Sequence, residues 1–321
     1  MPGNLVDRAA AALGRRHPRF LAVEVSDGVA GTAVRGFDPG ADVEIGSVSK
    51  GLTGLLFADA RSRGVVSDET PLGGLLDVGD AIGAVPLGSL ATHCSGLPRL
   101  ARGVGLRGQW GLMVHGRNPY GEDLAGLLDS ARRTPLRRPR PRYSNLGFML
   151  LGHALAAAEG VSYRDLLRAR VLEPLGMDGA TIPSGPVELG PHAATGTSRR
   201  GRPVEAWTGE ALGPAGGVRC TARDLERLVT ALLDGSAPGI EALDPVATMR
   251  GERLQVGAGW MVLRLRERTV TWHNGGTGGF RSMVCVDRSA GTGVALVSAT
   301  ARSVDRAAFG LLEALGHASG R

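Results

Sequence analysis

Lysine is almost absent from this 321-residue chain, which has 36 arginines and a single lysine, Lys50. Cysteine is scarce too: Cys94, Cys220 and Cys285 are odd in number and widely spaced, which argues against a disulfide framework and a cysteine-based zinc site. Aromatic residues make up 4% of the chain, so a core must be built mainly from aliphatic side chains. We expect the cysteines to be buried free thiols.

Long hydrophobic runs are missing as well. None reaches the roughly 20 residues that a membrane helix needs. Within residues 1–19 the apolar stretch is short and two arginines follow it at once, which does not resemble the core of a secretory signal. We therefore expect a cytoplasmic protein with no membrane partner. The histidines follow no metal-ligand spacing, so we expect no metal and no cofactor.

The charge balance is basic, with a formal net charge of +6 and a pI near 10.0. Six of the arginines fall within residues 132–142. Such a run can bind nucleic acid, and an arginine-driven nucleic-acid binder is one alternative for this chain. However, three prolines interrupt the run and no aromatic side chain is interleaved with it. We interpret it as a solvated loop and expect no nucleic-acid partner.

Hydrophobic periodicity predicts helices and strands in separate regions. Thr221, followed three residues later by Asp224, resembles a capping box at a helix start. The expected helices are residues 4–16, 50–61, 124–128, 146–157, 163–171, 225–233 and 304–318. The expected strands are residues 20–25 and 31–34, joined as a hairpin at Asp27-Gly28, and then 259–265, 270–272, 281–286 and 293–298. The strands of the last third read as consecutive and antiparallel, and the first and last helices are expected to pack on the same sheet.

The stretch from Ile45 to Lys50 contains a Ser-x-x-Lys step that enters an apolar helical run. Side chains three residues apart on a helix are neighbours, so the Ser47 hydroxyl and the Lys50 amine should lie within hydrogen-bond reach. An arginine stays protonated at any working pH, whereas a desolvated lysine can accept a proton from serine. The pair therefore predicts an activatable nucleophile. The alternative is a lysine on a solvated helix face, because the tetrapeptide is common.

Tyr143-Ser144-Asn145 follows the arginine-rich loop and precedes an apolar run. The start of a helix is a place where functional polar groups are often presented. The same three residues could equally serve only as a helix start, with Ser144 or Asn145 as its cap.

His273-Asn274-Gly275-Gly276 lies between two expected strands. Its glycines let backbone and substrate approach closely, and the backbone N–H groups could hold an oxyanion. A glycine-rich hairpin with an incidental histidine is the alternative. His93 is the rival for a catalytic histidine, although no Ser-His-Asp order and no Gly-x-Ser-x-Gly elbow supports it.

Taken in order, Ser47-x-x-Lys50, Tyr143-x-Asn145 and His273-x-Gly275 resemble the three motifs of the serine β-lactamase and penicillin-binding-protein superfamily, in particular its class C and esterase-like branch. The surrounding segments agree and keep the family's order. They are residues 45–53, 90–98, 143–152, 173–177, 214–225 and 273–280.

The resemblance implies an α+β fold: an antiparallel sheet flanked by N- and C-terminal helices, with a mostly helical region inserted. We expect a discontinuous sheet domain of residues 1–72 and 205–321, and an inserted helical domain of residues 73–204. The active site would lie in the cleft between them.

The resemblance also implies roles. Ser47 would be the acylated nucleophile, Lys50 the amine that helps to deprotonate it, and Tyr143 the phenol that relays the proton and serves in deacylation. Asn145, His273, Gly275 and Gly276 would bind substrate, and the backbone N–H groups of Ser47 and Gly276 would form the oxyanion hole. A tyrosine acts as a base only where nearby cations favour its phenolate.

These roles predict hydrolysis of a small-molecule ester or amide through an acyl-Ser47 intermediate. One alternative is a transacylase that moves the acyl group to a second small molecule, an amine or alcohol, in a biosynthetic pathway. Another is a catalytically silent binding protein. The chain departs from the family where Arg138 to Arg142 replace a Pro-Gly approach to the tyrosine, which predicts an altered pocket rim. It departs again where the last core strand ends in Ser298-Ala299-Thr300, since relatives often carry asparagine there.

Overall fold

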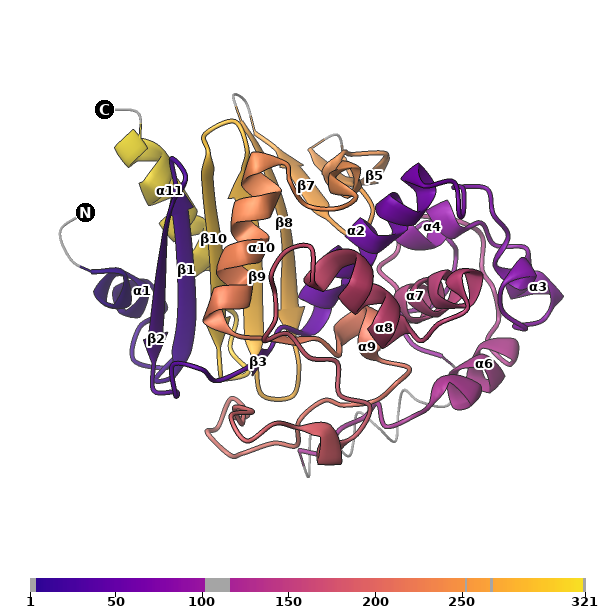
Figure 1. The fold of residues 1–321 in the computed structure, drawn as a ribbon, viewed down its shortest axis with the longest axis horizontal. Helices are drawn as coiled ribbons and strands as arrows, with labels where there is room; N and C mark the ends of the chain where they lie inside the picture. Colours follow the sequence, from indigo (N-terminus) through magenta and orange to yellow (C-terminus); the bar gives the residue numbers. More distant parts are fainter. Residues whose placement is uncertain (1–3, 102–115, 252, 266–267, 320–321) are drawn as a thin grey trace.

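The computed structural model describes residues 4–101, 116–251, 253–265 and 268–319, and an antiparallel sheet forms the centre of this part of the chain (Figure 1). Its strand order is β2-β1-β10-β9-β8-β7-β6-β5. The strands are β1 (Phe20–Ser26), β2 (Val29–Arg35), β5 (Ala247–Arg250), β6 (Leu254–Val256), β7 (Met261–Arg264), β8 (Thr269–Gly276), β9 (Arg281–Asp287) and β10 (Thr292–Ser298). A separate pair consists of β3 (Val43–Glu44) and β4 (Arg219–Cys220). The predicted α+β class is confirmed.

The first and last helices, α1 (Leu5–Leu13) and α11 (Asp305–Ser319), cover one face of the sheet and touch each other. Alternation along β1 explains why both faces are buried. Phe20 and Ala22 join the cluster beneath α1 and α11, whereas Leu21 and Val23 join the larger cluster on the opposite face. The expectation that the two terminal helices share a sheet is therefore confirmed.

Helix α10 (Ala222–Asp234) covers the opposite face, where it packs on β1, β2, β9 and β10 (Figure 1). It begins with the predicted capping box, in which the Thr221 hydroxyl accepts the Asp224 N–H and the Asp224 carboxylate accepts the Thr221 N–H. It ends at Gly235, whose φ of 82° is the left-handed conformation that favours glycine. The predicted signal therefore marks the start of the helix, which extends a little beyond the expected range of 225–233 at both ends.

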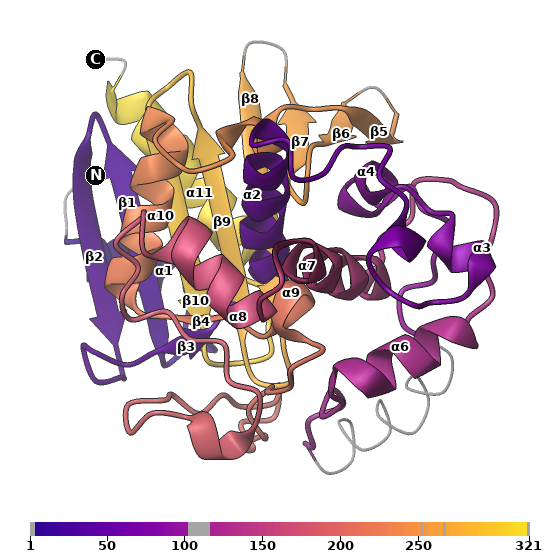
Figure 2. The same ribbon diagram turned by 45° about the vertical axis from the view of Figure 1, so that its right-hand side comes forward.

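Helix α2 (Ser49–Ser62) stands between the sheet and α7 (Asn145–Glu159), as Figure 2 shows. It packs against α7 and α9 (Gly213–Gly216). The remaining helical elements are α3 (Asp80–Gly83), α4 (Leu87–Ala91), α6 (Leu124–Arg132), α8 (Tyr163–Leu167), a π turn (Arg168–Leu172), and 3-10 turns at Gly46–Val48, Leu72–Gly74, Pro186–Glu188 and Ile240–Leu243. The division at residues 73 and 204 stays a prediction, and residues 102–115 of that region lie outside the described residues.

The structure corrects the sequence prediction at three places. His273 to Gly276 are not a connection between strands but the end of β8, because β9 supplies partners for them, with Gly276 opposite Arg281. The short strands β5 and β6 were not predicted, since neither is long enough to show a period. The helix expected over 163–171 ends as α8 at Leu167 and continues as a π turn.

The cysteines are free, as expected, but they differ in exposure. Cys220 and Cys285 are buried, and burial raises the pKa of both thiols. Cys94 is only partly buried, because it lies in the connection that follows α4.

Two helical glycines make a matched test of packing around α2. A Cβ on Gly54 would lie 1.8 Å from the Ala258 carbonyl oxygen, whereas a Cβ on Gly310 of α11 would meet nothing within 4 Å. Gly310→Ala should therefore leave stability unchanged or raise it by up to about 1 kcal/mol, the helix-propensity gain. Gly54→Ala should lower it by about 1 to 3 kcal/mol or more, because overpacking outweighs propensity. Chemical unfolding of both variants checks this, and equal effects would show that the approach of α2 to Ala258 is not tight.

Candidate active site

Ser47 lies in the 3-10 turn Gly46–Val48 that leads directly into α2, and its side chain is partly exposed. The turn packs against the end of β8. Gly46 has a φ of 51°, and a Cβ there would lie 2.7 Å from the backbone nitrogen of Gly276. A Cβ on Gly275 would lie 2.0 Å from the Ile45 carbonyl oxygen. Only glycine permits this approach, which sets the backbone of Gly276 beside the nucleophile.

Lys50 is fully buried at the start of α2, one helical turn after Ser47. Its Nζ lies 3.2 Å from Ser47 Oγ and donates to the Ala215 carbonyl oxygen at 2.5 Å. Burial lowers the pKa of Lys50 well below its usual value, and the positive charge of Arg99 lowers it further. The predicted pair is therefore formed, with an amine that can be neutral and can accept the serine proton.

Tyr143 lies just before α7, and Lys50 Nζ is 5.1 Å from the centre of its ring. Burial raises the pKa of Tyr143 above its usual value, while hydrogen bonding to Ser47 and the charge of Arg99 act in the opposite direction. The cations that the sequence argument invoked do not outweigh burial. Tyr143 is therefore a protonated phenol in the resting site, suited to relaying a proton, and Lys50 is the group suited to take one from Ser47.

The Tyr-Ser-Asn motif forms the start of α7, as one of its two interpretations predicted, and its functional role stays a prediction. Ser144 is the N-cap of α7, since its hydroxyl accepts the Gly147 N–H at 2.9 Å. Asn145 is buried, and its Nδ2 donates to the Tyr120 hydroxyl at 3.3 Å. The Asn145 Oδ1 is buried with no hydrogen-bond partner among the described residues. A buried acceptor left unpaired costs free energy, and it is suited to bind a donor on a ligand.

His273 and His93 flank Tyr143, with ring centres 6.1 Å and 4.5 Å from that of the tyrosine. The Nδ1 of His273 is 2.7 Å from the Asn274 carbonyl oxygen, so Nδ1 carries the hydrogen. The Nδ1 of His93 accepts the Ser144 N–H at 3.2 Å, so in His93 the hydrogen is on Nε2. The two rings therefore have opposite tautomers.

Neither histidine contributes a positive charge. Burial, followed by the charge of Lys50, lowers the pKa of His273 to about 3 and holds the pKa of His93 well below its usual value. His93, the rival for a catalytic histidine, packs against the rings of Tyr143 and Phe148, and no contact with Ser47 is among those described. It therefore helps to hold the tyrosine in place rather than acting on the serine.

A cavity of about 400 Å³ opens in front of the nucleophile. It is lined by Ser47, Arg99, Tyr143, Asn274, Gly275, Gly276, Arg281, Ser303 and Asp305. None of the arginines from Arg138 to Arg142 lines it. The arginines that do line the cavity are Arg99 and Arg281, which come from other segments of the chain.

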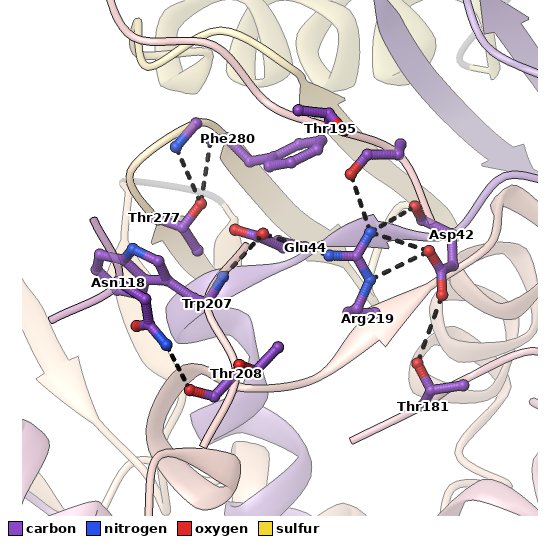
Figure 3. Close-up of polar contacts among 12 residues, drawn as sticks. Asp42, Glu44, Asn118, Thr181, Thr195, Trp207, Thr208, Arg219, Thr277 and Phe280 are labelled. Carbon is purple, nitrogen blue, oxygen red and sulfur yellow. Dashed lines mark hydrogen bonds and ion pairs between the residues drawn. The ribbon is translucent and has the colours of Figure 1, made fainter. Parts of the chain in front are cut away.

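Beneath the nucleophile, a buried ion-pair network fixes the strand that leads to Ser47 (Figure 3). Arg219 is fully buried and its Nη2 donates to Asp42 Oδ1 at 2.9 Å and to the Ala194 carbonyl oxygen at 3.0 Å. Its Nη1 donates to Glu44 Oε1 at 3.3 Å, and the same oxygen accepts the Trp207 N–H at 3.1 Å. Burial raises the pKa of Glu44. Because Asp42 and Glu44 flank Val43 in β3, the network holds both ends of that short strand.

The sequence profile of the beta-lactamase family matches residues 9–317. The chain belongs to the beta-lactamase family. It is 32% identical over 162 residues to the human "Putative beta-lactamase-like 1" and 30% identical over 152 residues to D-alanyl-D-alanine-carboxypeptidase/endopeptidase AmpH of Escherichia coli (strain K12). These alignments cover 50% and 45% of this chain but 30% and 37% of the relatives, so the match spans about a third of their length.

Solved structures share the fold of this beta-lactamase family member. Both the D-alanine carboxypeptidase AmpC from Burkholderia cenocepacia and a class C beta-lactamase from Rhodobacter sphaeroides superpose with a TM-score of 0.79. They cover 96% of this chain and 98% and 99% of their own, at 23% and 21% identity. The predicted sheet with terminal helices is therefore the fold of class C beta-lactamase structures.

Sequence reasoning missed several groups of this beta-lactamase family site. Arg99, Arg281 and Asp305 line the cavity, and the Ala215 carbonyl oxygen binds Lys50. Arg99 follows the segment 90–98, whose resemblance to the family was noted, but nothing in its type marks it among the 36 arginines. Within the described ranges, no cluster of three His, Cys, Asp or Glu residues could hold a metal, and no helix is long and apolar enough to cross a membrane.

The position of Lys50 predicts a pH-dependent nucleophile. Lys50→Arg keeps the charge but removes a group that can lose its proton, so reaction of Ser47 with a fluorophosphonate probe should slow at least about a hundredfold. In the parent protein the rate should fall as pH falls, because acid protonates the active neutral amine. The midpoint should lie well below 10.5, since the pKa of Lys50 is lowered. Intact-mass kinetics from pH 5 to 10 measure both effects.

Two variants control for folding. Lys50→Met has a similar volume and no base, and it should also react slowly. Arg61→Lys changes a basic residue near the other end of α2 and should react at the parental rate. Thermal unfolding shows whether each variant is folded. If the folded arginine variant reacts nearly as fast as the parent, Lys50 is not the base.

Proposed function

We propose that this protein is a serine hydrolase that cleaves a small-molecule ester or amide through an acyl-Ser47 intermediate. The observation that carries the proposal is the 3.2 Å contact between Ser47 Oγ and the buried Nζ of Lys50, whose pKa is lowered. A nucleophile within hydrogen-bond reach of an amine that can be neutral is the arrangement that nucleophilic catalysis needs. It also argues against the alternative of a catalytically silent binding protein.

In the acylation step, neutral Lys50 accepts the Ser47 proton while Oγ bonds to the substrate carbonyl carbon. The negative charge that develops on the carbonyl oxygen is stabilised by the backbone N–H groups of Ser47 and Gly276. The bond to the leaving alcohol or amine then breaks, and Tyr143, the phenol hydrogen-bonded to Ser47, passes a proton to the leaving group. The proton that Lys50 took replaces it. Water then attacks the carbonyl carbon of the acyl-enzyme, and the same groups take a proton from the water and return one to Ser47 Oγ. The acid is released and Ser47 is restored.

The groups around Ser47, Lys50 and Tyr143 would bind the substrate. The unpaired Oδ1 of Asn145 is buried behind the cavity lining, so it accepts a hydrogen bond from the amide of a substrate only where the ligand reaches past that lining. His273 is buried and does not line the cavity, so as a neutral ring with a pKa of about 3 it supports the end of β8 beside the substrate rather than touching substrate. Gly275 and Gly276 allow the substrate to lie along the end of β8 as a further extended segment. The names of the relatives, carboxypeptidases and beta-lactamases, support a small amide or ester as the substrate. The cytoplasmic location expected from the sequence stays a prediction.

The covalent step can be tested directly. Incubation with a fluorophosphonate or an activated ester should give a mass adduct that peptide mapping places on Ser47, and p-nitrophenyl esters should be hydrolysed. Ser47→Ala should give no adduct and lose at least about a hundredfold in rate. Ser62→Ala, on the exposed end of α2, is the matched control and should behave as the parent. An adduct elsewhere, or none at millimolar probe, would contradict the proposal.

The fate of the acyl group is read in the same assay. Candidate amines and alcohols are titrated while free acid and transfer product are both measured. A product that is free acid, with weak and linear diversion by all acceptors, is the outcome expected for a hydrolase. Saturable diversion at low acceptor concentration would instead establish a bound acceptor and a transacylase.

A further inference from the structure

Ser49, two residues after the proposed nucleophile, is fully buried and does not line the cavity, so it cannot touch substrate. Its hydroxyl donates to the Gly46 carbonyl oxygen at 2.7 Å and accepts the Val218 N–H at 3.2 Å. The single proton of this hydroxyl is therefore committed to one backbone carbonyl. None of the proposed catalytic steps uses Ser49.

The carbonyl that Ser49 binds belongs to the same peptide unit as the Ser47 N–H, one of the two proposed oxyanion donors. Because this unit is planar and trans, its carbonyl and its N–H point in opposite directions. The Ser49 hydroxyl binds the carbonyl in the interior, and the direction of the N–H on the other side is thereby fixed. The same bond makes the N–H a better donor, because linked hydrogen bonds polarise one another.

A second buried serine acts on the preceding peptide unit. The hydroxyl of Ser282 in β9 donates to the Ile45 carbonyl oxygen at 2.6 Å. It reaches that carbonyl over Gly275, its partner on β8, where a Cβ would lie 2.2 Å from Ser282 Oγ. The Ile45 N–H donates to the Val218 carbonyl oxygen at 3.2 Å. The chain that enters the Ser47 turn is therefore held from the sheet on one side and from Val218 on the other.

We propose that Ser49 is a positioning residue for the oxyanion hole, with Ser282 as its support from the sheet. The inference rests on the proposed function, in which the Ser47 N–H stabilises the developing oxyanion. Removal of one oxyanion donor typically lowers kcat by a factor of about 10² to 10³, and a donor that is present but poorly oriented loses part of that factor. The loss falls on kcat rather than on KM, because the oxyanion forms only in the transition state.

Steady-state kinetics with p-nitrophenyl butyrate provide the first test. Ser49→Ala should lower kcat by about tenfold or more and leave KM within about twofold of the parent value. Ser282→Ala acts one peptide unit further from the donor and should have a smaller effect. A folded Ser49→Ala protein with the parental kcat, or with a change in KM alone, would overturn the inference.

Ser162→Ala is the matched control. The Ser162 hydroxyl caps α8 by accepting the Asp165 N–H at 3.1 Å, and this exposed residue lies outside the cavity lining. Its loss should lower stability, as the loss of a helix cap does, and leave kcat unchanged. If Ser162→Ala lowers kcat as much as Ser49→Ala does, the effect is one of stability and the positioning role is wrong.

Two further substitutions of Ser49 separate its hydrogen bond from its packing. Ser49→Cys keeps a similar volume with only a weak donor, so its kcat should be close to that of Ser49→Ala. Ser49→Thr keeps the hydroxyl and should restore most of the parental kcat. Thermal unfolding identifies folded variants, and the cysteine variant decides the question if the larger threonine does not fit. Recovery of kcat by cysteine would show that packing alone matters.

The acyl-enzyme carries a spectroscopic signature of the oxyanion hole. Hydrogen bonds to the acyl carbonyl oxygen weaken its C=O bond and lower the stretching frequency. In infrared difference spectra with an isotope-labelled acyl carbonyl, the band of Ser49→Ala should therefore lie at higher wavenumber than that of the parent, and the band of Ser162→Ala should not move. Coincident bands for Ser49→Ala and the parent would contradict the positioning role.

Nuclear magnetic resonance separates this inference from the proposed function, because it requires no reaction. A hydrogen bond to a carbonyl deshields the amide nitrogen of the same peptide unit. The Ser47 nitrogen resonance should thus move upfield in Ser49→Ala, and the Gly46 resonance should do so in Ser282→Ala. If Ser47 proves unreactive, the proposed function fails, while these resonances still decide whether Ser49 orients the Ser47 peptide. If Ser47 reacts and its amide resonance is unchanged in Ser49→Ala, only the positioning role is wrong.

Discussion

The site depends on one contact, the meeting of the turn that carries Ser47 with the end of β8. Two glycines, Gly46 and Gly275, bring the two backbones together without side chains between them. Because the turn belongs to the start of α2 and the strand belongs to the sheet, this contact sets the proposed nucleophile beside the backbone of Gly276. The ion pairs of Arg219 with Asp42 and Glu44 hold the chain that enters the turn. Displacement at either point would move the serine away from the Gly276 backbone, the proposed oxyanion donor.

Burial has a larger effect than neighbouring charges on the pKa values of the groups around Ser47. It lowers the pKa of Lys50, His93 and His273 and raises that of Tyr143. Each of these groups is therefore biased towards its neutral form, and the permanent charges of the site, Arg99 and Arg281, lie on the side of the cavity. A neutral interior lets protons move among Ser47, Lys50 and Tyr143 without creating a lasting charge in a medium that solvates charge poorly.

Local signals were sufficient for much of this fold. The capping box at Thr221, the turn at Asp27-Gly28 and the pairing of Ser47 with Lys50 depend on residues a few positions apart, and the structure contains all of them. The length of β8 could not be predicted in this way, because glycines are poor strand formers and its end exists through pairing with β9. Family resemblance supplied the order of the motifs, which no local pattern gives.

The sequence could not show which of the many arginines line the cavity. Arg99 and Arg281 have the same type as 34 other arginines, and only tertiary structure places them on the cavity. The tautomers of His93 and His273 are likewise set by backbone groups, the Ser144 N–H and the Asn274 carbonyl oxygen, that a sequence does not bring together. Such contacts are the products of long-range packing rather than of local propensity.

The burial of the single lysine also makes the surface of the protein chemically unusual. Since Lys50 is fully enclosed beside the nucleophile, the exterior offers no lysine amine to reagents that modify such groups. Modification of a lysine by reductive methylation or by an amine-selective ester would therefore require the reagent to enter the interior, and no other lysine would contribute to the signal. The basic side chains of the protein thus divide by type, with guanidinium groups at the surface and the one lysine amine enclosed beside Ser47.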